Sequence, residues 1–169
     1  MDAKVDGAGA GQTARIRDYR ASDAPELARL FYETVRSVNR ADYSEEQVRA
    51  WAPRPPDPAE LHARAAGRRT LVAEEGGEVV GFAELEEDGH LDTLYLRKDV
   101  VGRGIGRKLY EAVEREARGW GLGRIYTEAS ITARPFFERR GFRVVRERSV
   151  MVRGASMTNF AMEKDLPPG

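Results

Sequence analysis

The sequence has 169 residues, of which 41% are hydrophobic, and its 28 basic side chains balance 28 acidic ones. This length suits one domain with a substantial core, and zero net charge provides no general attraction to nucleic acid or membrane. The absence of cysteine excludes disulfides, thiolate metal sites and a cysteine nucleophile. No stretch resembles a signal peptide or a membrane span, so we expect a cytoplasmic protein with no metal site.

The first part of the chain predicts a tail, one strand and three helices. Residues 1–12 are rich in Gly and Ala and are expected to form a disordered tail before a single domain over residues 13–166. A strand is expected over residues 13–18, and Ser22 or Asp23 can cap the helix that follows. Ser44-Glu45-Glu46-Gln47 is a capping box that opens a short helix ending near Trp51. A further helix is expected over residues 59–66.

From residue 69 onward, strands alternate with helices. Strands are expected over residues 70–75 and 78–86, joined by the two-residue turn Gly76-Gly77, and over residues 90–96. A helix begins at residue 105, a strand spans 124–128, and a helix spans 131–140 and stops at Gly141. Two strands, 142–152 and 157–164, complete the chain. The predicted fold class is therefore α/β or α+β with a largely antiparallel sheet.

Residues 91–116 combine a strand, a glycine loop and an amphipathic helix. The loop reads Val101-Gly102-Arg103-Gly104-Ile105-Gly106. The first amides of a helix have no internal partner and bind anions readily, and the cations nearby favour phosphate. The pattern is neither a P-loop nor a Rossmann loop, because Arg107 and Lys108 stand where those motifs need other residues. The alternative is a turn that only joins the strand to the helix.

The loop resembles the acyl-CoA loop of the GNAT N-acetyltransferases, Gln/Arg-x-x-Gly-x-Gly/Ala, with Val101, Gly104 and Gly106 at its defined places. The stretch from Ser130 to Phe142 resembles the second GNAT signature. Three longer stretches, residues 43–51, 128–142 and 153–164, are similar to the YafP-like branch of bacterial acetyltransferases.

The resemblance implies a GNAT-like mixed sheet of six to seven strands flanked by about four helices. It also implies an N-acetyltransferase that moves the acetyl group of acetyl-CoA directly to an amine of a small molecule or a protein. The C-terminal strand is a plausible pairing edge for a homodimer. The residues expected to bind the cofactor are Leu94, Tyr95, Leu96, Gly102, Arg103, Gly104, Ile105, Gly106, Arg107, Ser130 and Phe136.

Three residues depart from the family pattern. Val101 has no polar side chain, and Ser130 stands where the family often has Asn. Phe137 replaces the Tyr that protonates the departing thiolate in many members, and a phenyl ring cannot transfer a proton. These departures leave an alternative function open: an acyl-CoA-binding module without catalytic activity. A third hypothesis, a nucleotide-dependent enzyme, predicts stronger binding of ATP or NAD than of CoA.

The candidate catalytic residues are those able to accept a proton from an ammonium group. His90 and Asp92 are two residues apart and are expected on one face of their strand. Either could bind the amine or relay its proton, and Glu84 and Glu128 are further candidates. Tyr43 is a possible proton donor. Four of them have a structural alternative: a solvated turn for His90, a hydrogen bond within the fold for Asp92, a solvated outer face of the sheet for Glu84, and docking of a helix for Tyr43.

Overall fold

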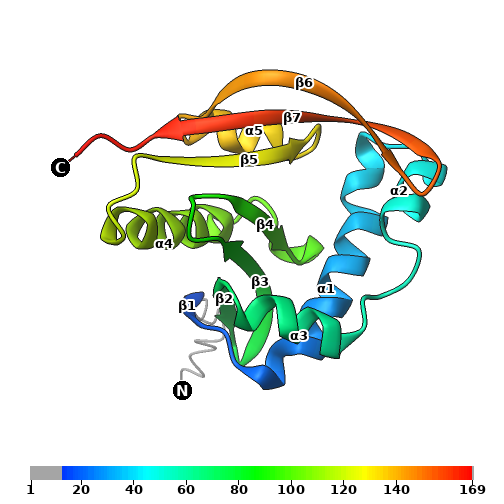
Figure 1. The fold of residues 1–169 in the computed structure, drawn as a ribbon. Helices are drawn as coiled ribbons and strands as arrows, with labels where there is room; N and C mark the ends of the chain where they lie inside the picture. The colour runs from blue at the N-terminus through cyan, green and yellow to red at the C-terminus, as the bar shows by residue number, and fades with distance from the viewer. Residues whose placement is uncertain (1–12, 169) are drawn as a thin grey trace, which may run out of the picture.

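The computed structural model describes residues 13–168, so the tail expected at residues 1–12 lies outside the described residues. In chain order the elements are β1 (Arg15–Asp18), α1 (Ala24–Ser37), α2 (Glu45–Trp51), α3 (Pro58–Ala66), β2 (Arg69–Glu75), β3 (Glu78–Leu85), β4 (Leu91–Leu96), α4 (Ile105–Gly119), β5 (Arg124–Ser130), α5 (Arg134–Arg139), β6 (Arg143–Val152) and β7 (Ala155–Asp165). Two antiparallel sheets, with strand orders β1-β2-β3-β4 and β5-β7-β6, confirm the predicted fold class (Figure 1).

Local sequence signals account for several element boundaries. Ser44 Oγ accepts the Gln47 amide and the Gln47 side chain accepts the Ser44 amide, which is the predicted capping box at the start of α2. Gly141 has φ 92°, a conformation in which glycine is strongly favoured. Helix α5 is shorter than expected because residues 131–133 form a turn, in which Ser130 Oγ accepts the Ala133 amide at 3.0 Å.

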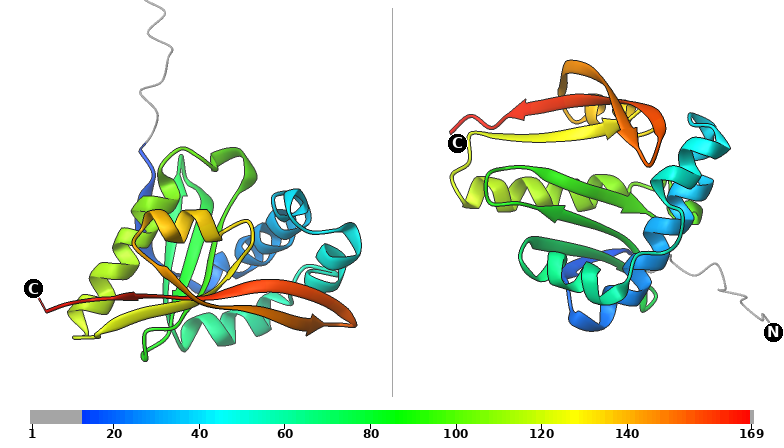
Figure 2. Two further views of the ribbon diagram at one scale, coloured as in Figure 1. Left: turned by 90° about the horizontal axis from the view of Figure 1, so that it is seen from above. Right: turned by 45° about the vertical axis from the view of Figure 1, so that its right-hand side comes forward.

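The first sheet is buried on both faces, with α4 on one side and α1 and α3 on the other (Figure 2). Successive residues of a strand point to opposite faces. Accordingly Leu71 and Ala83 pack in the cluster that contains α4, whereas Val72 and Phe82 pack in the cluster formed with α1 and α3. This sandwich fixes β4, the strand that leads into the glycine loop.

The two sheets meet at one end of β4 and β5 and then diverge. A single parallel bridge joins His90 to Tyr126, and Thr127 Oγ1 donates to the carbonyl of Leu91 at 2.7 Å. Strand β7 pairs with β5 along its other edge throughout, whereas among the described residues β5 has no ladder with β4 past this bridge, which leaves an opening between the two strands. The divergence of β4 and β5 positions the site described below.

The C-terminal strand lies in the middle of the second sheet. Strand β7 pairs with both β5 and β6, so the expectation that it forms a free edge is wrong, and β6 is the outer strand instead. The tip of the β6–β7 hairpin reaches α2, where Arg153 donates to the carbonyl of Ala50 at 2.8 Å and Gln47 donates to that of Ser156 at 2.8 Å. A helix of membrane-crossing length and hydrophobicity is absent from residues 13–168.

Candidate active site

Two cavities of about 400 Å³ each adjoin the opening between β4 and β5. The loop cavity is lined by the glycine loop together with residues of α1 and α5. The sheet cavity is lined by residues of β4 and of all three strands of the second sheet, together with Tyr43 and Trp51. Both cavities share part of their lining, namely Leu94, Tyr95, Ser130, Ala133 and Phe137. Ligands in the two cavities would therefore meet between the two strands.

The glycine loop is open toward the loop cavity. Gly102 and Gly104 have φ 83° and 84°, and a Cβ at either position would meet nothing within 4 Å. Lys108 N–H is the first amide bonded within α4, to the carbonyl of Gly104 at 3.2 Å, so the amides of residues 105–107 have no acceptor within the helix. At Gly106 a Cβ would lie 3.1 Å from both Leu96 Cδ1 and Phe136 Cε2. The backbone there is close to its neighbours and exposes amides rather than side chains.

The side chains of the loop cavity are suited to an anionic ligand. Arg107, Arg139 and Arg140 line it, and no carboxylate of residues 13–168 belongs to its lining. Two buried polar atoms in this lining, Thr132 Oγ1 and Arg140 Nε, have no hydrogen-bond partner within the described part of the chain. Unpartnered buried groups of this kind are rare in folded proteins, and a bound ligand can supply their partners. The donor set fits the phosphates and amides of coenzyme A.

The structure brings together the predicted cofactor residues except for two side chains. Arg103 donates to both carboxylate oxygens of Glu75, at 3.1 and 3.0 Å, and its amide bonds to the carbonyl of Val100. Ile105 is buried in a core cluster with Ala73 and Val100. These two side chains point away from the loop cavity because one has an ion-pair partner and the other is apolar. Only the backbone of Ile105 remains available to a ligand.

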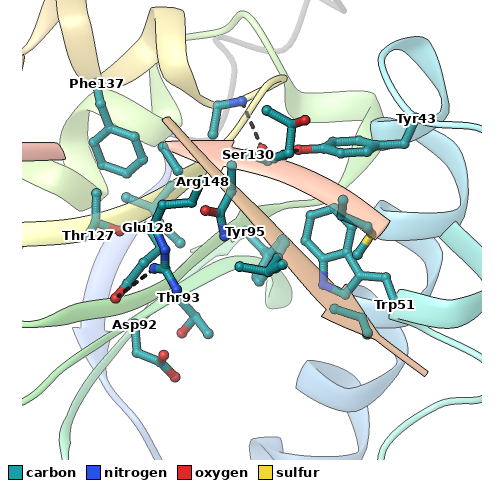
Figure 3. Close-up of a pocket in the computed structure, with 18 residues that line it drawn as sticks. Tyr43, Trp51, Asp92, Thr93, Tyr95, Thr127, Glu128, Ser130, Phe137 and Arg148 are labelled. Carbon is teal, nitrogen blue, oxygen red and sulfur yellow. Dashed lines mark hydrogen bonds and ion pairs between the residues drawn. The ribbon is translucent and has the colours of Figure 1, made fainter. Parts of the chain in front are cut away.

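The sheet cavity carries the carboxylates Asp92 and Glu128 at one end and the rings of Tyr43 and Trp51 at the other (Figure 3). Asp92 Oδ2 lies 2.5 Å from Arg68 Nη1. Glu128 Oε2 lies 2.5 Å from His90 Nε2, and its other oxygen lies 3.8 Å from Arg148 Nη1. Both carboxylates are partly exposed, so each can exchange a present partner for an ammonium group of a ligand.

Strand register builds one wall of the sheet cavity. Ser130 on β5 is opposite Asn159 on β7, which is opposite Arg148 on β6. Asn159 Oδ1 and Thr93 Oγ1 are buried without hydrogen-bond partners in the described structure, and both residues line this cavity. Asn159 and Arg148 were not among the residues predicted from sequence. Only the pairing of β7 with β5 and β6 identifies them, and no sequence signal specifies that pairing.

His90 does not line either cavity but contacts a residue that does. Its Nδ1 lies 2.8 Å from Glu86 Oε1, its Nε2 contacts Glu128, and its ring stacks on Tyr126 with centroids 4.9 Å apart. Burial alone would lower the pKa of His90, but the hydrogen bonds to Glu128 and Glu86 outweigh burial and raise it. As the spacing predicts, His90 and Asp92 share a face, and with Glu86 their polar atoms lie within 4.8 Å of one another.

Glu84 lies away from both cavities. Its side chain is fully buried on β3 and accepts hydrogen bonds from Arg64 Nε and Nη2 at 3.0 and 2.9 Å. Arg68 Nη1 lies 3.4 Å from the same carboxylate. The structure therefore places Glu84 in an arginine cluster that links β3 to α3, where its carboxylate cannot reach a ligand in either cavity.

Tyr43 lines the sheet cavity, but its hydroxyl is already occupied. The hydroxyl donates to the carbonyl of Thr158 at 2.6 Å and accepts the Ile131 amide at 2.9 Å. Burial raises the pKa of Tyr43. Its ring meets Trp51 edge to face at 5.5 Å. The phenol therefore joins α2 to the second sheet, and its proton is engaged in that contact.

Comparisons with known proteins agree with this geometry. A family model described as an acetyltransferase (GNAT) domain matches residues 39–164. The uncharacterized N-acetyltransferase YafP of Escherichia coli (strain K12) is 32% identical over 148 residues, which cover 88% of this chain and 93% of YafP.

Solved structures share the fold. A GCN5-related N-acetyltransferase from Rhodopseudomonas palustris superposes with a TM-score of 0.87 and 36% identity, over 92% of this chain and 98% of that one. PaiA N-acetyltransferase from Thermoplasma acidophilum, solved with coenzyme A, gives a TM-score of 0.74 at 21% identity, over 91% and 99% of the two chains. The resemblance inferred from sequence is thus confirmed: the chain belongs to the GNAT acetyltransferase family.

Proposed function

We propose that this protein transfers the acetyl group of acetyl-CoA directly to an amine, with the cosubstrate in the loop cavity and the amine in the sheet cavity. One observation carries the proposal: the two cavities that meet between β4 and β5 have opposite charge. Among residues 13–168, three arginines and no carboxylate line the loop cavity, whereas the sheet cavity is lined by Asp92 and Glu128 and by one cation, Arg148. An anionic donor and a cationic acceptor each find a complementary surface.

Acetyl-CoA is the cosubstrate of this family, and it would supply the thioester. The amides of the first turn of α4 and the side chain of Arg107 are the groups that we propose hold its diphosphate. Ser130 lies in both cavities, and its oxygen accepts the Ala133 amide, which leaves its hydrogen free to donate. We assign it to hydrogen bonding with the acyl-bearing end of the cosubstrate. Phe137 also lines both cavities, but its phenyl ring has no proton to donate.

Glu128 and Asp92 would bind the acceptor as an ammonium ion and take up its proton. An alkylammonium has a pKa near 10.4, so at neutral pH a base must remove a proton before the nitrogen can attack. In the balanced reaction the nitrogen forms the amide bond, the carbon–sulfur bond breaks, one proton ends on sulfur and one is released. His90 would act through Glu128 as a positioning residue, and it could pass the released proton toward solvent.

The acceptor that we favour is a small molecule. The sheet cavity has the volume of a typical small-molecule site, and the β6–β7 hairpin is hydrogen-bonded to α2 at its aromatic end. An amino group on a flexible protein segment is the second possibility. The proposal includes a cytoplasmic location, a single domain over residues 13–166 and the possibility of a homodimer.

Thiol release from acetyl-CoA, measured with a panel of amines, tests the proposal. We expect turnover above background, and a loss of about a hundredfold or more in Glu128→Gln with CoA affinity nearly intact. Asp92→Asn should reduce turnover by raising the KM for the amine. Glu138→Gln removes an exposed carboxylate outside both cavities and serves as the matched control. Tight CoA binding without turnover on any amine would favour the inactive acyl-CoA-binding module instead.

A further inference from the structure

Two arginines at the end of α5 carry charge that the fold does not neutralise. Arg139 and Arg140 line the loop cavity, and within residues 13–168 neither lies within ion-pair distance of a carboxylate. Arg134, in the same helix, contacts Glu138 at 2.6 Å, and Arg103 in the glycine loop contacts Glu75. Arg139 and Arg140 thus also differ from Arg107, the third arginine of the cavity lining, whose Nε lies 3.9 Å from Glu111 Oε1.

The position of Arg140 is fixed by an aromatic contact. Its guanidinium carbon lies 4.6 Å from the centre of the Phe136 ring, and Phe136 is the ring that approaches Gly106 at the start of α4. This chain of contacts places Arg140 beside the glycine loop. Its Nε is buried and has no acceptor among the residues that the structure describes. A buried donor without a partner destabilises the fold, and a ligand oxygen at this point would satisfy it.

Coenzyme A has more than one anionic group for this cavity to bind. The diphosphate matches the amides at the start of α4, which the proposed function already assigns to it. The remaining group is the phosphate monoester on the ribose 3′ oxygen, and a monoester carries a charge of about −1.5 to −2 at neutral pH. Arginine is suited to such a group, because its planar donors bind two phosphate oxygens at once.

We propose that Arg139 and Arg140 form a second anion subsite, which binds the 3′-phosphate of coenzyme A and distinguishes it from 3′-dephospho-coenzyme A. This inference rests on binding of the cosubstrate in the loop cavity, as the proposed function has it. It adds a binding role for two side chains outside the glycine loop. The subsite would select the complete cosubstrate over precursors and fragments that lack this one phosphate.

Isothermal titration calorimetry with coenzyme A and 3′-dephospho-coenzyme A tests the subsite through binding alone. The wild type should bind coenzyme A about tenfold to a hundredfold more tightly, since a hydrogen bond to a charged group has an effect of that size. In Arg140→Gln the affinity for coenzyme A should fall by about tenfold or more, while that for the dephospho form changes little. Arg139→Gln should show the same pattern more weakly, because Arg139 is the more exposed of the two.

The control variant is Arg146→Gln, and three results would contradict the inference. Arg146→Gln removes the same charge from an exposed position on β6 and should leave both affinities unchanged. Equal binding of the two ligands by the wild type would overturn the inference. The inference would also fail if Arg140→Gln lowered the affinity for both ligands equally, since that arginine would then bind the diphosphate, which both ligands carry. If neither ligand bound the wild type, the loop assignment in the proposed function would fail as well.

Discussion

Alanine substitutions at two glycines of α4 test whether the start of this helix lies close to α5. Gly106 lies in the first turn and Gly119 is the last residue of the helix. Replacing a helical glycine by alanine stabilises a helix by about 0.5–1 kcal/mol where space allows. A Cβ at Gly119 would meet nothing within 4 Å, so Gly119→Ala should be neutral or stabilising by up to that amount.

At Gly106 the same methyl group would be too close to its neighbours. It would lie 3.1 Å from Leu96 Cδ1 and 3.1 Å from Phe136 Cε2, so both side chains must shift by a few tenths of an ångström. Overpacking of this kind costs about 1–3 kcal/mol. Set against the gain in helix propensity, Gly106→Ala should be neutral to about 2 kcal/mol less stable than the wild type. The two variants should thus differ by about 1–3 kcal/mol in favour of Gly119→Ala.

Urea unfolding measures the stability difference, and calorimetric titration with coenzyme A measures its effect on the site. Because Leu96 and Phe136 both line the loop cavity, Gly106→Ala should also weaken coenzyme A binding, whereas Gly119→Ala should not. Equal stability and equal affinity in the two variants would refute the close approach of α4 to α5, and with it the placement of Arg140 beside the loop.

Three further changes test other parts of the structure. Glu84→Gln should lower the free energy of unfolding by about 1.5–3 kcal/mol, because a neutral amide replaces the fully buried carboxylate that accepts hydrogen bonds from the partly exposed Arg64, and coenzyme A affinity measured in parallel should not change. His90→Gln should lower the melting temperature more at about pH 5.5 than at about pH 9: the raised pKa of His90 means that its charged form stabilises the fold at low pH and that this contribution disappears as the pH rises through that pKa. Arg153 has φ 45°, a conformation that glycine adopts at lower cost than alanine. The free energy of unfolding should therefore be about 1 kcal/mol higher for Arg153→Gly than for Arg153→Ala, although both variants lose the hydrogen bond to α2. Equal urea midpoints would argue against backbone strain there.

Features that depend on nearby residues could be predicted from the sequence. The capping box at Ser44, the turn at Gly76-Gly77 and the left-handed cap at Gly141 each depend on residues within a few positions of one another. The glycine loop belongs to the same class, since the helix that exposes its amides begins within the motif. These predictions succeeded because the interactions that determine such structures are local.

Features that depend on strand pairing could not be predicted in the same way. Strand β7 inserts between β5 and β6, and this order brings Asn159 and Arg148 into the row with Ser130. Consecutive strands are often but not always neighbours, so the sequence leaves the order open. The partners of Glu84 are likewise distant in the chain: Arg64 lies on α3, and only tertiary packing shows that the carboxylate is already paired.

The divergence of β4 from β5 links the fold to the proposed chemistry. The carbonyl of Leu96 accepts a hydrogen bond from Thr34 Oγ1 at 2.8 Å, so the backbone groups of Leu96 face away from β3. Because hydrogen-bonding direction alternates along an antiparallel strand, Leu94 also directs its N–H and C=O away from β3, into the opening where β5 no longer pairs. Backbone groups in such a place need partners, and an extended ligand with amide groups can supply them as an added strand would. A strand that paired fully with β5 would satisfy these groups and leave no junction between the two cavities.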